Sequence, residues 1–139
     1  MFKKKIKKKM KGKKLVDNWI KTLETLEPEE IVKLYSNKGI LLGTLAEEPL
    51  LGREQIKTYF DKFVTFHPEG NVTWWYNQNL GFSKIAIDGN YTFWLDEEKA
   101  RKKVEARFTF VFRRNWLRFG KWEIITHHSS ERPRKPKKI

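Results

Sequence analysis

Cysteine is absent from the 139 residues of this chain, so a disulfide framework and a thiolate zinc site are both excluded. No apolar run approaches the length of a membrane-spanning helix. The start is positively charged, but no apolar segment follows it as one does in a signal peptide. Together these absences predict a soluble protein of the cytoplasm.

Catalytic sequence motifs are also missing. The chain has no phosphate-binding glycine loop, no G-x-S-x-G nucleophile motif and no kinase motif. We therefore expect no cofactor, and we name no catalytic residue from a motif.

Positive charge is plentiful, with a formal net charge of +13, but it is unevenly distributed. Residues 1–14 hold nine Lys, and residues 132–138 hold five Lys and Arg. The segment 15–131 holds the other 16 cations and all 17 acidic residues, so its net charge is −1. The basicity therefore belongs to the ends of the chain.

Charge and composition predict three segments: a disordered Lys-rich tail at 1–14, one folded domain at 15–131 and a basic tail at 132–139. An alternative for the first segment is a basic helix. Phe2, Ile6 and Met10 recur every four residues, although Gly12 interrupts the pattern. Such a helix could lie on a nucleic acid or an anionic membrane.

Helical periodicity dominates the first half of the domain. A first helix is indicated by apolar residues at helical spacing, namely Val16, Trp19, Ile20, Leu23 and Leu26. Pro28 suits the first position of a second helix, whose apolar face includes Leu34 and Tyr35 and which ends near Gly39. Gly52 opens a third helix, with an apolar face formed by Ile56, Tyr59, Phe60 and Phe63.

From Asn71 onward the period changes from 3.6 to 2, which is typical of strands. The expected strands are 40–42, 72–78, 84–88, 89–95, 103–114 and 121–130. Helices followed by antiparallel strands predict an α+β fold with the helices against one face of the sheet.

Arg107 is the informative residue of the strand at 103–114. Alternation places it opposite Phe108 and Phe110, whose side of the strand could form the core or meet a second sheet in a dimer. A buried charge must be paired, so Arg107 could form an internal salt bridge with Glu105 or Asp88. Equally, it could line a pocket and bind an anion through its planar guanidinium.

The last strand carries two adjacent histidines. Strict alternation puts Trp122, Ile124 and His128 on one face and His127 on the other. The two imidazoles therefore point apart and cannot chelate one metal ion together, and we expect no metal site.

Several short motifs occur in an order typical of one superfamily: Leu41–Leu45, Gly52–Ile56, Ala86–Asp88, Ala106–Val111 and Gly120–Ile124, closing on His127–Ser130. The sequence resembles the nuclear transport factor 2-like superfamily, SnoaL-like proteins included. Within it, the chain is similar to the association domain of calcium/calmodulin-dependent protein kinase II.

This resemblance implies a cone-shaped curved antiparallel sheet on three helices, with an internal pocket and dimers or larger oligomers formed through the sheet. It places Arg107, Tyr91 and His128 in the pocket and Tyr35, from the second helix, near its wall. Two features depart from the family pattern. Tyr91 stands where the kinase-linked domain has an Arg, and Asn115–Gly120 replaces a tight turn.

The function expected from these residues is an oligomerising module, a homodimer or larger, that binds a small polar or anionic ligand. One alternative is a small enzyme like ketosteroid isomerase or polyketide cyclase, with Asp88 and His128 as its acid–base candidates. A second alternative assigns activity to the basic tails, which would dock the domain to nucleic acid or an anionic membrane.

Overall fold

The computed structural model describes the backbone of residues 2–134 and the side chains of residues 10–134. The helices are α1 (Phe2–Glu24), α2 (Pro28–Val32) and α3 (Gly52–Phe63), with short 3-10 turns η1 (Val64–Phe66) and η2 (Trp116–Arg118). The strands are β1 (Tyr35–Leu42), β2 (Leu50–Leu51), β3 (Glu69–Asn79), β4 (Lys84–Glu97), β5 (Ala100–Asn115) and β6 (Lys121–Glu131).

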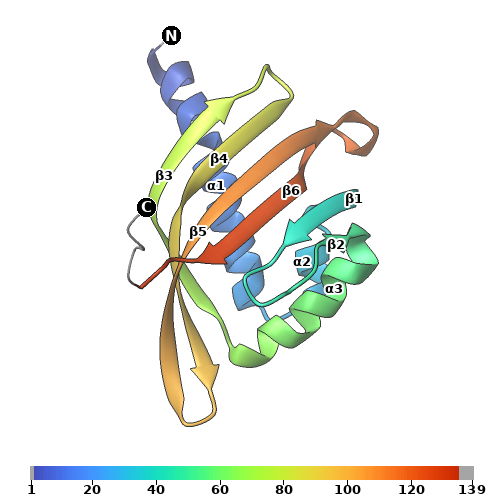
Figure 1. Cartoon of the computed structure of the whole chain (residues 1–139). Helices are drawn as coiled ribbons and strands as arrows, with labels where there is room; N and C mark the ends of the chain where they lie inside the picture. The colour runs from blue at the N-terminus through green and yellow to red at the C-terminus, as the bar shows by residue number, and fades with distance from the viewer. Residues whose placement is uncertain (1, 135–139) are drawn as a thin grey trace.

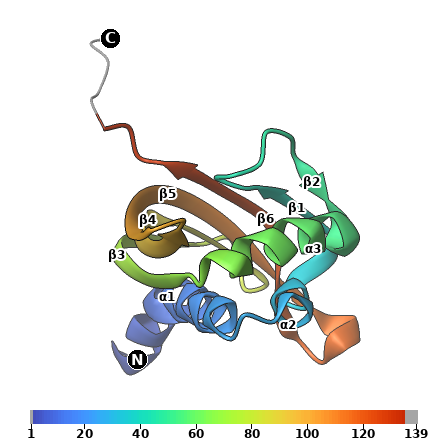
Figure 2. The same cartoon turned by 90° about the horizontal axis from the view of Figure 1, so that it is seen from below.

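The six strands form one curved, open sheet in the order β2-β1-β6-β5-β4-β3. Neighbouring strands are antiparallel except β1 and β6, which run parallel. All three helices lie on one side of the sheet (Figures 1 and 2). The predicted α+β fold, with a curved sheet on three helices, is confirmed.

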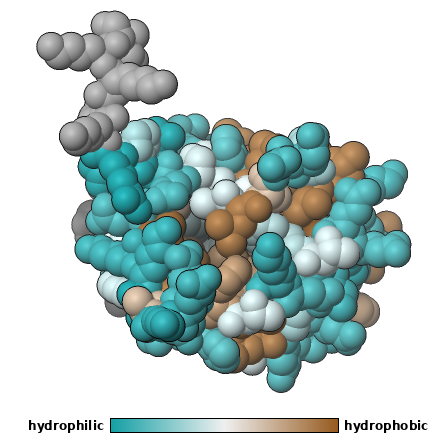
Figure 3. Space-filling model, turned by 60° about the horizontal axis from the view of Figure 1, so that its bottom comes forward, coloured by the Kyte–Doolittle hydropathy of each residue, from teal (hydrophilic) through white to brown (hydrophobic). Residues whose placement is uncertain are grey.

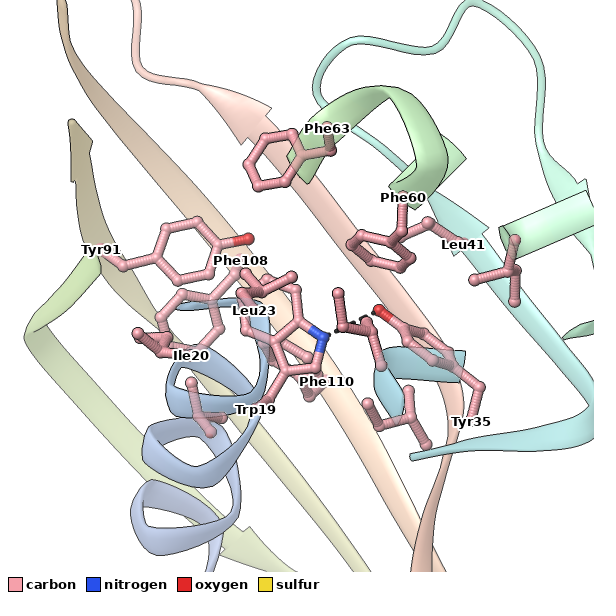
Figure 4. Packing of buried hydrophobic residues seen from close by; sticks show 14 of the residues in the cluster. Trp19, Ile20, Leu23, Tyr35, Leu41, Phe60, Phe63, Tyr91, Phe108 and Phe110 are labelled. Carbon is pink, nitrogen blue, oxygen red and sulfur yellow. Dashed lines mark hydrogen bonds between the residues drawn. The ribbon is translucent and has the colours of Figure 1, made fainter. Parts of the chain in front are cut away.

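The core fills the inner side of the sheet around Trp19 of α1 (Figure 4). Its indole stacks on Tyr91 of β4 and meets Phe60 of α3 and Phe110 of β5 edge-on. The Phe side of β5 is therefore the interior of the domain. Aromatic pairs at these distances add to the stability from apolar burial.

Helix α1 differs from the tail expected at residues 1–14, because it begins at Phe2. Gly12 explains how this part of the helix packs. Its N–H donates to Asn77 Oδ1 of β3 at 2.9 Å, and a Cβ at this position would lie 3.1 Å from Ile87. The helix thus extends past the predicted domain boundary. Within residues 2–134, none of the helices combines the length and apolar character that a membrane span requires.

At the other end, Arg132 leaves the sheet with its N–H bonded to the carbonyl of Glu105. The rest of the predicted basic tail, residues 135–139, lies outside the described residues.

The second helix is shorter than predicted. Pro28 occupies its first turn as expected, but the helix ends at Val32 and Tyr35 begins β1. The helix ends here because the chain pairs with the last strand, where the Ile124 N–H donates to the Leu34 carbonyl at 2.9 Å. Tertiary pairing here overrides the helical spacing of Leu34 and Tyr35.

Gly89 does not separate two strands as predicted, because β4 runs through it without a break. The facing strand β3 has a register shift between Val72 and Trp74, which brings the Trp74 carbonyl close to Gly89. A Cβ on Gly89 would lie 2.3 Å from that oxygen and 2.6 Å from the Phe108 ring. Glycine is needed here for close approach of two strands.

We expect Gly89→Ala to destabilise the domain by roughly 2 kcal/mol or more, because backbone on one side and a buried ring on the other leave no room for a methyl group. Chemical denaturation measures the change. Gly81→Asn is the matched control, since Gly81 has φ 83° with open space around it and Asn tolerates that conformation. Equal stability of the Gly89→Ala and wild-type chains would contradict the packing described.

Candidate functional site

A small cavity of about 30 Å³ lies on the inner side of the sheet, between β1, α3, β4, β5 and β6. Figure 3 shows the molecule with the bottom of the Figure 1 view turned forward, where brown apolar side chains lie among teal polar ones. The lining residues are Trp19, Leu41, Gly43, Thr44, Leu45, Tyr59, Phe60, Phe63, Tyr91, Phe93, Leu95, Val104, Ala106, His127 and Ser129. The space suits one or two water molecules, since one water needs at least about 10–15 Å³.

A β-bulge in β6 determines which of its side chains reach this cavity. Thr126 pairs with Val111 and Ile124 pairs with Phe112, so Ile125 is an extra residue without a partner on β5. An extra residue reverses the alternation of side chains beyond it. Ile124 and His127 consequently face the same interior, although they are three residues apart.

Hydrogen bonds connect the polar groups of the cavity wall into one chain. Trp19 Nε1 donates to the Tyr35 hydroxyl at 3.1 Å, and that hydroxyl lies 2.8 Å from His127 Nδ1. On the other side of the imidazole, Nε2 lies 3.3 Å from the Tyr91 hydroxyl. The Tyr91 hydroxyl donates to Ser129 Oγ at 2.6 Å.

The direction of this chain follows from its first member. An indole N–H can only donate, so the Tyr35 hydroxyl accepts from Trp19. The Tyr91 hydroxyl donates to Ser129 and so accepts from His127 Nε2, which leaves His127 Nδ1 to accept the Tyr35 proton. His127 then carries its proton on Nε2 and donates it toward Tyr91. Every group is satisfied when His127 is neutral.

Burial enforces the neutral state of His127. Its side chain is 2% exposed, and desolvation, helped by the adjacent His128, lowers its pKa to about 3. Burial also raises the pKa of Tyr35 and Tyr91 well above the ordinary tyrosine range, and that of Tyr59 to about 12. At neutral pH the polar groups of the cavity wall are therefore uncharged.

The four predicted pocket residues divide evenly between the two faces of the sheet. Tyr91 lines the cavity. Tyr35 does not line it but is hydrogen-bonded to His127, which does. Arg107 and His128 are both exposed on the outer face. Arg107 alternates with the buried Ala106 and Phe108, while His128 points outward because of the bulge.

These positions correct the expectation of an anion-binding pocket and of acid–base residues within it. No Lys, Arg, Asp or Glu is among the residues that line the cavity. Asp88, the second acid–base candidate, lies on the outer face and accepts a hydrogen bond from Thr109. Among the described residues, no group of three His, Cys, Asp or Glu side chains could hold a metal ion.

Sequence reasoning missed Trp19, Thr44, His127 and Ser129 as members of this site. Ser129 Oγ lies 2.7 Å from Thr44 Oγ1, which continues the hydrogen-bond chain to the loop after β1. One signal was present: Ile124 and Ile125 form an apolar doublet that breaks the alternation of β6. Such a doublet is a mark of a bulge.

The fold itself defines the class of protein, since solved structures of very low identity superpose on it. An NTF2-like protein with a cystatin-like fold from Novosphingobium aromaticivorans is 9% identical with a TM-score of 0.70, and the match covers 88% of this chain and 80% of that one. A ketosteroid isomerase-like protein from Erwinia carotovora atroseptica is 8% identical with a TM-score of 0.71, covering 89% and 94%. The chain has the NTF2-like, cystatin-like fold.

Sequence similarity narrows this class to one family. Residues 8–133 match the calcium/calmodulin dependent protein kinase II association domain, and the chain belongs to this family. A Xanthomonas campestris structure described as such an association domain is 38% identical, with a TM-score of 0.81 and coverage of 87% of this chain and 85% of that one. No functionally curated protein sequence matches this chain at a significant level.

The neutral state of His127 predicts an acid-sensitive fold. The folded pKa lies near 3 and the unfolded value near 6.5, so the unfolded chain binds more protons in this window and stability is lost as pH falls through it. We expect His127 to account for a loss of about 2 kcal/mol between about pH 7 and pH 5. Denaturant titrations across this range measure it.

His127→Gln is expected to lower stability at neutral pH, because the bonds to Tyr35 and Tyr91 are altered, and to flatten the acid dependence. His128→Gln is the matched control and should retain the wild-type acid slope, since its ring is exposed. If the two variants showed the same pH dependence, His127 would not be the titrating group.

Proposed function

We propose that this domain is a self-association module whose copies pair through the outer face of the sheet. The observation that carries the proposal is the character of that face. It is broad and is covered by no helix among the described residues (Figure 2). It also presents exposed apolar side chains toward both edges. Membership of an association-domain family supports the same reading.

Two rows of paired residues cross the outer face. The first row is Ile40, Thr126, Val111, Ala86 and Gln78. The second row is Leu42, His128, Thr109, Asp88 and Tyr76. Thr126, Val111 and Ala86 give the middle of the first row short side chains, and Ile40, Leu42 and Tyr76 place larger ones toward the edges. A centre of short side chains allows two sheets to approach closely.

The two charges nearest the centre of this face have opposite sign. Near its centre lie one cation, Arg107, and one carboxylate, Asp88. Among the described residues, the Arg107 side chain makes neither an ion pair nor a hydrogen bond, whereas the Asp88 carboxylate accepts one from Thr109. A two-fold axis brings the same patch of both copies together, so Arg107 of each copy can meet Asp88 of the other. This assigns to Arg107 a role between copies.

The cavity contributes a second, smaller element of the proposal. Its uncharged lining and volume of about 30 Å³ favour water or a very small neutral polar molecule over an anion. A larger ligand would have to displace Leu45 or Tyr59 at its rim. The isomerase-like alternative is disfavoured, because Asp88 and His128 both lie outside the cavity.

Val111→Asp tests the proposed interface. Val111 is half-buried on the outer face, so a carboxylate is tolerated in a single copy but would be desolvated without a partner between two copies. We expect self-association to weaken by roughly a hundredfold or more, about 3 kcal/mol. Sedimentation equilibrium of the full chain over a range of concentrations measures the change.

Val111→Thr is the matched control, because it keeps the shape and the strand preference of valine and should retain association. A wild-type chain that remains monomeric at micromolar concentration would contradict the proposal. So would a Val111→Asp chain that associates as tightly as wild type while remaining folded.

A further inference from the structure

Exposed apolar side chains gather at one end of the sheet, away from the outer face and the cavity. Two hairpin tips supply them: Leu80 and Phe82 between β3 and β4, and Trp116, Leu117 and Phe119 between β5 and β6. Phe82 is 82% exposed, Leu117 96% and Phe119 104%. The rings of Phe82 and Trp116 lie 6.4 Å apart, so the two tips form one surface, here called the hairpin surface.

The tip of the β5–β6 hairpin is held in place by polar contacts at its base. Arg118 Nη1 donates to the buried Glu123 carboxylate at 2.7 Å, and Asn115 Nδ2 donates to the same carboxylate at 2.9 Å. Asn115 Oδ1 also accepts from Leu117 N–H at 3.1 Å. The apolar tip is therefore displayed by an anchored turn.

Phe119 is the most unusual residue of the surface. Its φ of 58° lies in the left-handed region, which is unfavourable for a bulky side chain. It nevertheless points wholly into solvent and packs against nothing in its own domain. Strain combined with exposure of a large apolar side chain indicates a role in binding a partner.

Charge around the hairpin surface identifies the partner. Among the described side chains, residues 10–14, 80–84 and 113–121 hold eight Lys and Arg and no Asp or Glu. Lys11 of α1 lines the same hollow as Phe82 and Arg114. Figure 1 shows the start of α1 and both hairpin tips at the same end of the molecule. A second copy of this end would be repelled, so the complement is an extended anionic surface.

We propose that the hairpin surface and the Lys-rich start of α1 form a docking site for an anionic lipid bilayer. Apolar tips enter the boundary between headgroups and acyl chains, while the surrounding cations bind anionic headgroups. Arg114 lies 5.2 Å from both the Trp116 and Trp122 ring centres, and indole rings favour the same boundary. Leu117, at the tip of the β5–β6 hairpin, favours lipid over nucleic acid, because an aliphatic side chain cannot stack on a base.

Vesicle sedimentation tests this docking site with the full chain. We expect binding to phosphatidylcholine vesicles that contain phosphatidylserine, weaker binding at high salt, and little binding to phosphatidylcholine alone. The combined variant Phe82→Ser, Leu117→Ser, Phe119→Asn should bind these vesicles at least roughly tenfold more weakly than wild type. It should keep the wild-type Tm, because these side chains are exposed and Asn tolerates the conformation of residue 119.

Trp94→Ser is the matched control, since it removes an exposed aromatic ring at the other end of β4 and should leave binding unchanged. The chain has no cysteine, so Leu117→Cys accepts a single polarity-sensitive dye. Its emission should shift to the blue on vesicles, whereas a dye on Lys99→Cys, in the opposite hairpin, should not respond.

Three outcomes would overturn the docking site: no binding to the phosphatidylserine vesicles, equal binding of the combined variant and wild type, or no response of the dye at residue 117. Competition by duplex DNA without any dye response would assign the basic end to nucleic acid instead.

Discussion

The requirement that one buried imidazole remain uncharged organises the interior of this domain. His127 accepts a hydrogen bond from the Tyr35 hydroxyl and donates one to the Tyr91 hydroxyl. Both tyrosines are in contact with Trp19. The four side chains come from β6, β1, β4 and α1, so one hydrogen-bond chain fixes the relative positions of elements far apart in sequence. Because each member is buried, loss of one partner leaves another unsatisfied at a cost of about 1–3 kcal/mol.

Curvature of the sheet separates the proposed activities of the molecule in space. Its concave side is occupied by aromatic packing and by a cavity of about 30 Å³, which leaves little volume for chemistry. Its convex side is covered by no helix among the described residues, and the apolar hairpin tips lie beyond it at one end of the sheet. Self-association and lipid contact would use different surfaces, so a dimer could present two basic ends at once. Two ends bind a common surface more strongly than either alone.

Much of the fold was predictable, because the long helix, the third helix and the strands follow clear periodicities. The candidate site was less predictable, because a bulge interrupts the strand that supplies two of its residues. Alternation across β6 holds only on each side of Ile125, and the extra residue exchanges the expected places of His127 and His128. Tyr35 was assigned to a helix because only its distant pairing partner, Ile124, makes it a strand residue. Bulges and long-range pairings depend on tertiary structure, so a local sequence pattern indicates them only weakly.

The parallel pairing of β1 with β6 affects how the domain folds during its synthesis on the ribosome. Tyr35 and His127 are 92 residues apart, yet each completes the surroundings of the other. The first strand and the first helix must therefore wait until β6 has been synthesised before the interior can close. Contacts this distant in sequence form slowly, and they leave the nascent chain with unpaired strand edges meanwhile. A chain that stopped before Lys121 would lack the strand that makes the beginning of the domain native.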